Sequence, residues 1–399
     1  MFKGIMGLLA GACLSAGAAP AQQGDPALIR AAVLRVDVAG LPPISRLDLR
    51  PADLGFAGAR LAIDDNDTTG RFMGQDFEAE EVASTPDAAG AELDRLLGEG
   101  IEFVVLLADD ATTLALADQA GDRAIILNAA ARGDNLRGAD CRFNTIHVAP
   151  SHAMLADALT QFLMWKNWPR WFLIEGSHPE DTGYADAFRR SAAKFGAKIV
   201  EQRVFEDTGG ARSTDSGHVQ VQKQMPVFTQ RAAEHDVVVT ADEADVFASY
   251  LPYQTWDPRP VTGSAGLVPR SWHPAMEAWG ATQFQNRFER LANRPIREED
   301  YQTWLALRMI GEAATRTGSG DPAALREFML SDQFDVAGFK GQKLTLRAWD
   351  HQVRQPILLT TGNLTVSVSP QDQYLHQTSQ LDTLGIDRPE TECTFQEAS

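Results

Sequence analysis

Arg270 and Trp272 lie two residues apart in a proline-rich stretch, residues 258–274, and their side chains suit the binding of a flat anion. A guanidinium pairs with a carboxylate through two N–H groups, and an indole offers a stacking face, so the two could hold one ligand together. Proline-rich stretches favour irregular chain between structured elements. The sequence therefore predicts a binding pair where one domain crosses to another.

A second stretch, Asp65-x-Asp67-x-Thr69-Gly70 with Asp76, has oxygen-bearing side chains at the spacing of a calcium-binding loop. In such a loop the last ligand is a glutamate, and a helix follows. Here the last residue is an aspartate, and the residues after it alternate like a strand. A plain helix-to-strand turn is the favoured interpretation, with calcium as the alternative.

Sequence signatures of catalysis are missing. Ser177 stands in Gly-Ser-His and not in a G-x-S-x-G elbow, and no H-E-x-x-H, P-loop or C-x-x-C motif occurs. His147 and His152 are close in sequence, but two histidines without a third ligand are weak evidence for a metal. The sequence thus favours a binding protein over an enzyme, with no metal and no resident cofactor.

Strand–helix patterns must position these residues. Apolar residues recur at helical spacing between two strand patterns, residues 31–36 and 76–82. We expect this helix to begin near residues 51–53 and to end in the turn Asn66–Gly70. A strand–helix–strand unit is typical of a parallel sheet, and the apolar run 101–107 indicates a sheet covered by helices on both faces.

The pattern restarts at Ser151, which can cap a helix. The other expected helices are 86–97, 111–119, 151–166, 181–195, 226–234, 242–250, 275–291, 298–315 and 322–330. The other expected strands are 123–127, 143–148, 171–174, 198–205, 236–240, 343–349 and 356–361. Residues 208–217 are expected to form a surface loop.

Two such blocks predict an α/β fold of two Rossmann-like lobes joined by three crossings. The expected N-terminal lobe is 28–149 plus 275–335, and the expected C-terminal lobe is 150–274 plus 336–368. Residues 369–399 are expected to form a polar, irregular tail. Ligands sit beyond the carboxyl ends of the strands in such sheets, so a cleft that closes by hinge motion is expected between the lobes.

The 399 residues carry a net charge of −18, which argues against nucleic acid and anionic membranes as partners. Residues 1–21 contain Lys3, an apolar run and an Ala-x-Ala site ending at Ala21, which is typical of a secretory signal peptide. We therefore expect a periplasmic, monomeric protein that begins at residue 22. A lipoprotein processed at Cys13 is less favoured, because Ala10 stands where leucine is usual.

Two cysteines follow the signal segment, Cys141 and Cys393. In an oxidising compartment they could form a disulfide that ties the C-terminal tail to the N-terminal lobe. Two separate thiols are an equally good interpretation of the sequence.

The stretch Ala62–Phe72, with a strand pattern on each side, resembles the opening of the branched-chain-amino-acid type of periplasmic binding protein. The broad resemblance extends from Leu28 to Thr361. The same stretch and Trp272–Gly280 are also similar to a subfamily of ABC-transporter substrate-binding proteins associated with PQQ-dependent alcohol dehydrogenase systems. The resemblance implies the type I periplasmic binding protein fold and delivery of a small molecule to an ABC permease in the inner membrane.

The resemblance also implies ligand contacts in loops that follow strands. In the amino-acid binders, hydroxyls of one such loop hold the ligand carboxylate, and here Thr112 keeps a hydroxyl. Asp109 and Asp110 would repel a carboxylate, and Asp110 could instead cap the following helix. Arg132, in the next loop, could form a fork to a carboxylate.

In the second lobe, His178 and Tyr184 match the loop where the family offers an aromatic side chain, although Tyr184 has the spacing of a core residue. Asp242 matches an acid that contacts a ligand ammonium, or it caps a helix. Arg270 and Trp272 suit PQQ, which is planar and tricarboxylic, and a small carboxylate from alcohol oxidation is the other ligand implied. A periplasmic interaction or sensor protein of the same fold, without import, is the alternative function.

Overall fold

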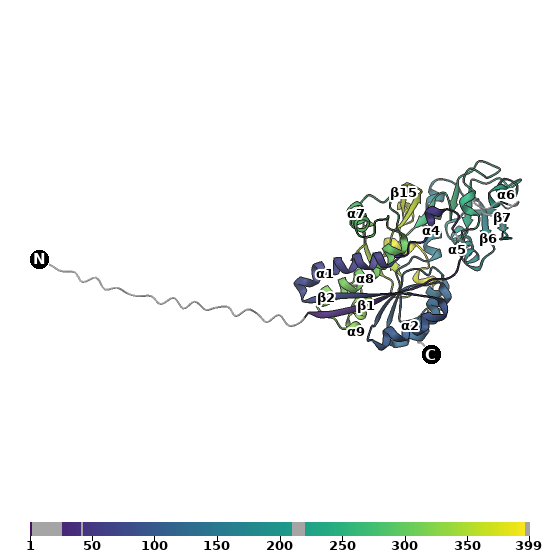
Figure 1. Ribbon diagram of the computed structural model, residues 1–399. Helices are drawn as coiled ribbons and strands as arrows, with labels where there is room; N and C mark the ends of the chain where they lie inside the picture. Colours follow the sequence, from purple (N-terminus) through teal and green to yellow (C-terminus); the bar gives the residue numbers. More distant parts are fainter. Residues whose placement is uncertain (2–25, 41–42, 210–219, 396–399) are drawn as a thin grey trace.

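A computed structural model describes residue 1 and residues 26–40, 43–209 and 220–395 (Figure 1). All but residue 1 of the expected signal peptide, and most of the expected 208–217 loop, lie outside the described residues. Within the described part, no helix has the length and apolar character needed to cross a bilayer.

The N-terminal lobe contains a five-stranded parallel sheet in the order β2-β1-β3-β4-β5. Alternate strand residues face opposite sides, so Val33 and Val105 pack in one apolar cluster while Leu34 and Leu106 pack in another. The strands are β1 (Ala27–Val36), β2 (Gln75–Ser84), β3 (Phe103–Leu107), β4 (Ile125–Asn128) and β5 (Thr145–His147).

Helices cover both faces of this sheet. One face holds α2 (Pro86–Gly98) and α3 (Asp110–Ala120), and the other holds α1 (Phe56–Met73), α7 (Ala281–Ala292), α8 (Glu298–Thr317) and α9 (Pro322–Met329). Helices α1 and α8 cross closely, because Gly58 leaves room for the backbone of Asp300.

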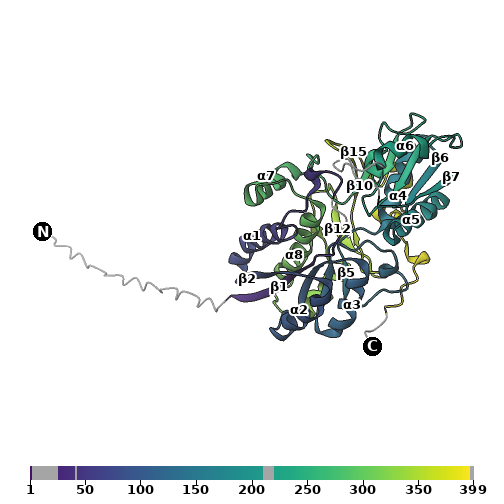
Figure 2. The same ribbon diagram turned by 45° about the vertical axis from the view of Figure 1, so that its right-hand side comes forward.

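The C-terminal lobe repeats this plan around a four-stranded parallel sheet in the order β7-β6-β8-β9 (Figure 2). Its strands are β6 (Arg170–Gly176), β7 (Lys198–Phe205), β8 (Val237–Ala241) and β9 (Val261–Gly263). Helices α4 (His152–Trp165) and α5 (Pro179–Phe195) cover one face, and α6 (Val221–Phe228) lies on the other.

Three crossings join the lobes, as expected for two Rossmann-like units. The first follows β5, the second runs from β10 (Val268–Arg270) to α7, and the third contains β11 (Val336–Ala337), β12 (Lys343–Leu346) and β13 (Val353–Arg354). Strands β14 (Ile357–Thr361) and β15 (Leu364–Ser369) then pair with β10 in an antiparallel sheet.

Helix α1 differs from the expectation at both ends. It begins at Phe56, and the predicted stop at Asn66–Gly70 is wrong, because the helix continues to Met73 and ends at the left-handed Gly74. The amide of Asn66 donates to the carbonyl oxygen of Leu307 in α8 at 3.0 Å, so a residue typical of turns is used for helix–helix contact.

Other expected helices are also corrected. Helix α6 begins before Pro226 and ends at Phe228, and α7 begins at Ala281 rather than 275. The α-helix expected at 242–250 is absent, and the segment between β8 and β9 contains only a 3-10 turn, Ala248–Tyr250. Strand β15 was not predicted, although Leu364, Val366 and Val368 alternate with Thr365, Ser367 and Ser369 as in a strand.

The C-terminal tail is irregular, as expected, but it is docked rather than loose. Its three 3-10 turns are Asp372–Tyr374, Gln380–Thr383 and Arg388–Glu390. Gly385 donates its N–H to Asp157 of α4 at 2.9 Å, and a disulfide joins Cys393 to Cys141 between β4 and β5. The tail therefore contacts both lobes.

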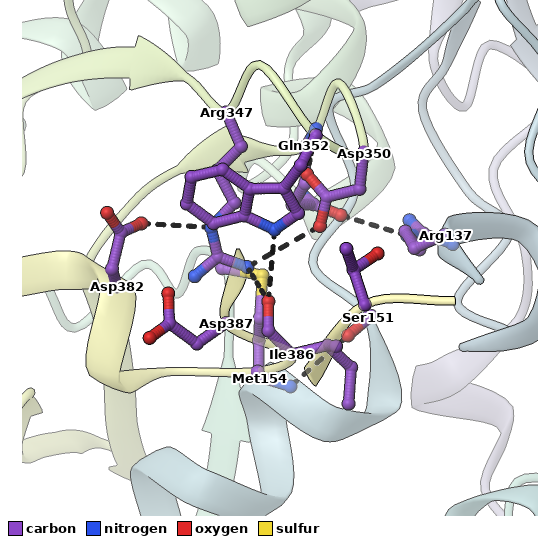
Figure 3. A network of polar contacts seen from close by, with 12 residues as sticks. Arg137, Ser151, Met154, Arg347, Asp350, Gln352, Asp382, Ile386 and Asp387 are labelled. Atoms are coloured by element: carbon purple, nitrogen blue, oxygen red, sulfur yellow. Dashed lines mark hydrogen bonds and ion pairs between the residues drawn. The ribbon is translucent and has the colours of Figure 1, made fainter. Parts of the chain in front are cut away.

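A buried polar network holds the tail at the crossings (Figure 3). The guanidinium of Arg347 donates to Asp382 Oδ1 at 3.0 Å and to the carbonyl oxygen of Leu384 at 2.6 Å. Nearby, Gln352 Oε1 accepts from Arg137 Nε at 2.9 Å. The network links residues of the N-terminal lobe, the third crossing and the tail.

Candidate ligand site between the lobes

Arg132 is the cation at the centre of the site, in the loop that follows β4. Its guanidinium lies 3.5 Å from a carboxylate oxygen of Glu243, which follows β8 in the other lobe. It also lies 3.5 Å from a carboxylate oxygen of Glu298, the first residue of α8. Both distances are long for direct ion pairs, so Arg132 is loosely shared between two acids.

Glu298 is held more tightly by the second crossing. Its carboxylate accepts from Arg270 Nη1 at 2.8 Å, from the Ser271 N–H at 2.8 Å and from Ser271 Oγ at 2.9 Å. A negative charge at a helix N-terminus is also favoured by the helix dipole. Burial by itself raises the pKa of Glu298, but Arg132 and Arg270 outweigh it and lower the pKa.

Glu243 faces a histidine as well as Arg132. His152 Nε2 lies 3.4 Å from Glu243 Oε2, and the imidazole stacks on the ring of Tyr184 with centroids 5.0 Å apart. Burial by itself raises the pKa of the Glu243 carboxyl, but the His152 hydrogen bond and the Arg132 charge hold the pKa at about 2. Glu243 is therefore a carboxylate at neutral pH.

Two cavities border this charged cluster. One has a volume of about 610 Å³ and is lined by Arg132, Arg270, Glu298 and residues of the β1–α1 and α7–α8 connections. The other has a volume of about 620 Å³ and is lined by His178, Glu243 and further residues of the β1–α1 connection. Both have the size of small-molecule sites.

The three predicted residues at the start of α3 are engaged locally. Asp109 Oδ1 accepts the Thr112 N–H at 2.7 Å and is the helix cap. The sequence had offered Asp110 as the cap, but Asp110 Oδ1 instead accepts the Gly133 N–H at 3.0 Å. That bond fixes the loop beside Arg132.

Asp242 is also engaged by the backbone, because its carboxylate accepts the N–H groups of Val246, Phe247 and Ala248. These three hydrogen bonds hold an irregular segment where the sequence predicted a helix. The neighbouring Glu243 is the acid that faces the other lobe.

The predicted stacking of a ligand on Trp272 is contradicted by its burial. The side chain is 1% exposed and stacks on Tyr301 with centroids 4.5 Å apart, so it belongs to the core of the N-terminal lobe. Arg270 and Trp272 both border the cavity of about 610 Å³. Only Arg270 offers an accessible side chain there, because the indole is covered by its own lobe.

His178 and Tyr184 occupy different surroundings. His178 Nε2 lies 3.0 Å from Asp207 Oδ2, a hydrogen bond that raises the pKa of His178, and the side chain lines the second cavity. Tyr184 is 2% exposed between His152 and Phe188. It is therefore mainly a packing residue beneath His152.

The alternative calcium loop is excluded by the local structure. Asp65 to Gly70 lie inside α1, and Asp65 pairs with Arg287 and accepts from Trp304 Nε1 at 2.9 Å. Among the residues that the structure describes, no cluster of three or more His, Cys, Asp or Glu side chains could hold a metal ion.

Sequence reasoning missed His152, Glu243 and Glu298. Glu243 was within reach, because it directly follows a predicted strand and its acidic neighbour. Glu298 and His152 begin helices, and no local pattern separates an acid or a histidine that faces a cleft from one that caps a helix.

Two parallel-sheet lobes, three crossings and a charged site between the lobes define a two-lobed ligand-binding protein. The chain belongs to the periplasmic binding protein family, whose sequence model matches residues 53–365. This is a family of binding proteins and not of enzymes. No curated protein sequence matches the chain.

Solved structures support the same fold. A branched chain amino acid ABC transporter periplasmic ligand-binding protein from Burkholderia xenovorans is 16% identical, with 92% of this chain and 99% of that chain covered and a TM-score of 0.70. An ABC transporter substrate-binding protein from Sphaerobacter thermophilus is 17% identical, with 86% and 98% covered and a TM-score of 0.68.

A solute-binding protein from R. palustris, in complex with benzoate, is 13% identical, with 92% of this chain and 99% of that chain covered and a TM-score of 0.66. At these identities the likeness establishes the type I periplasmic binding protein fold.

Proposed function

We propose that this protein is the periplasmic solute-binding component of an ABC importer and that it binds a small carboxylate between its lobes. The observation that carries the proposal is the loose position of Arg132, 3.5 Å from both Glu243 and Glu298. A ligand carboxylate can form a tighter fork with this guanidinium than either acid does.

The charge balance of the site favours a ligand with little net charge. Arg132 and Arg270 supply two positive charges, and Glu243 and Glu298 supply two negative charges. A zwitterionic amino acid adds no net charge and would offer its ammonium to Glu243. A monocarboxylate such as benzoate adds one negative charge and would rely on the arginines.

PQQ is the ligand suggested by the subfamily resemblance, and the site suits it less well. Three carboxylates would have to be matched by arginines that already have partners. Arg132 and Arg270 face two acids, Arg294 donates to Asp300, and Arg297 donates to backbone carbonyl oxygens. The buried Trp272 gives a planar ring system no face to stack on in this conformation.

Similar solved structures agree with a small carboxylate. The protein from R. palustris is in complex with benzoate, and one from Desulfitobacterium hafniense is in complex with Leu. Closure of the lobes around such a ligand would present both lobes to a permease in a fixed relation, and a ligand that binds only the closed form would shift the population to it.

Thermal unfolding of the chain from residue 22 onward tests the proposal. The protein is unfolded and refolded to remove carried-over ligand, and leucine, benzoate, acetate, PQQ and calcium are added separately. A ligand that binds only the folded state raises the unfolding midpoint as its concentration increases. At a ligand concentration of a hundred times Kd, the free energy of unfolding increases by about 2.7 kcal/mol.

Variants assign the binding to this site. Arg132→Ala and Arg270→Ala should weaken binding at least tenfold, because a charge-assisted hydrogen bond contributes roughly 1.5–3 kcal/mol. Arg290→Ala, on the outer side of α7, is the matched control. Glu243→Gln should weaken the binding of leucine more than the binding of benzoate, because only leucine has an ammonium group to face Glu243. If no compound shifts the midpoint, an interaction or sensor protein without import becomes the better proposal.

A further inference from the structure

The connection between β1 and α1 is long for a strand-to-helix loop. Strand β1 ends at Val36 and α1 begins at Phe56, whereas such loops usually contain about 2–6 residues. Residues 43–51 of this connection are named the partition segment here, and they include a 3-10 turn, Arg46–Asp48. Long loops inside compact domains are commonly functional.

The N-terminal lobe holds the partition segment through Arg297, the residue that precedes α8. Its guanidinium donates to three consecutive backbone carbonyl oxygens, those of Leu47 at 3.4 Å, Asp48 at 3.3 Å and Leu49 at 3.0 Å. Only a guanidinium offers several N–H donors in a fixed fork, so a lysine could not reproduce this set of contacts.

The C-terminal lobe holds the other end of the segment. The N–H of Ile44 donates to Asp245 Oδ2 at 3.2 Å, and the Ile44 side chain packs against the apolar cluster beneath α6. The partition segment is therefore anchored on both lobes at once.

The partition segment also stands between the two cavities. Leu47 and Pro51 line the cavity of about 610 Å³, Pro43 and Arg50 line the cavity of about 620 Å³, and Asp48 lines both. The two cavities approach each other at Arg132 and Glu243. Arg132 lines the cavity of about 610 Å³, Glu243 lines the cavity of about 620 Å³, and their side chains are 3.5 Å apart.

We propose that the partition segment sets the upper size limit of the ligand by keeping these two cavities separate, with Arg297 as the positioning residue. The proposal rests on the proposed function. A compact carboxylate fits one cavity beside Arg132, with the aliphatic side chain of Leu47 on the cavity wall. A carboxylate too long for one cavity needs both cavities and therefore needs the segment to move.

The first test needs no ligand. Trypsin cleaves after arginine, so the Arg46–Leu47 bond reports release of the segment, whereas Arg50 precedes a proline and resists cleavage. Cleavage of this bond, followed by mass spectrometry, should be about tenfold faster in Arg297→Gln, because it tracks the population of the released state. Arg297→Lys should be intermediate, and Arg290→Gln should match the wild type. Wild-type cleavage rates in Arg297→Gln would overturn the anchoring role.

The second test uses carboxylates of equal charge and increasing length, namely benzoate and biphenyl-4-carboxylate. The ratio of the biphenyl Kd to the benzoate Kd should fall at least tenfold in Arg297→Gln. Because Arg297 also lines the first cavity, loss of its charge affects both carboxylates alike, and the ratio rather than either Kd alone is the readout. An unchanged ratio would overturn the size limit. If neither benzoate nor leucine binds the wild type, the proposed function and the size limit both fail, while trypsin still decides whether Arg297 anchors the segment.

Discussion

Glu243→Gln is expected to lower the free energy of unfolding at neutral pH and to have almost no effect near pH 2. The carboxylate lies between Arg132 and His152, and both stabilise its charged form. Burial alone would raise the pKa of this carboxyl, but these partners hold the pKa at about 2, below the ordinary 4.5. Glutamine keeps the shape of the side chain and removes the charge.

The magnitude follows from the two pKa values. The difference between 4.5 and about 2 corresponds to roughly 3 kcal/mol of preferential stabilisation of the charged form in the folded state. Because the folded pKa of Glu243 is the lower one, the unfolded state binds more protons between these values. The stabilisation is therefore complete above about pH 5 and disappears as pH falls through about 2.

Urea unfolding of the wild type and of Glu243→Gln at pH values from 7 down to 2.5 measures this effect. The difference in unfolding free energy between the two proteins should shrink steadily as the pH falls. Glu234→Gln is the matched control, because Glu234 is 76% exposed, and it should show no such trend. A difference that stays the same at every pH would mean that packing, and not charge, holds Glu243.

Two further changes test the fold. Cys393→Ser, or reduction of the bond to Cys141, should lower the unfolding free energy by about 2–5 kcal/mol in urea titrations, and equal stability of oxidised and reduced protein would argue against a structural bond. Gly58→Ala should lower the free energy of unfolding by about 1–3 kcal/mol, and with it the thermal midpoint, because the new Cβ would lie 2.0 Å from the Asp300 carbonyl oxygen. Gly98→Ala, with no atom within 4 Å of the new Cβ, should leave the midpoint unchanged or raise it slightly, because alanine is the better helix former. Equal effects of the two glycine substitutions would contradict the close crossing.

The strand–helix order was predictable because the apolar strands and amphipathic helices are local patterns. The cap of α4 by Ser151 and the left-handed end of α5 at Gly196 also follow from residue types alone. Helix α1 was predicted to stop too early, because Asn66 and Gly70 are common in turns. Their actual partners lie in α8 and β2, and no window of sequence around α1 contains α8.

The site was less predictable than the fold. Arg132 and His178 were singled out because the family resemblance places ligand contacts in loops that follow strands, and Arg270 because it stands beside Trp272 in the proline-rich second crossing. The sequence could not separate Asp242 from Glu243, since their roles depend on which carboxylate the following backbone captures. Trp272 was assigned to the ligand because its burial could not be foreseen. The indole is covered by Tyr301, which lies in a distant segment of the chain.

The disulfide between the N-terminal lobe and the C-terminal tail has a consequence for how the protein is made. Cys141 and Cys393 are separated by 252 residues, so a chain that emerges from its N-terminus exposes the first thiol long before its partner exists. The Cys141 side chain is buried in the finished protein, and the tail that carries Cys393 is also held by Asp157 of α4 and by Arg347 of the third crossing. An intact Cys141–Cys393 bond therefore reports that the end of the chain has been made and has docked back onto the N-terminal lobe.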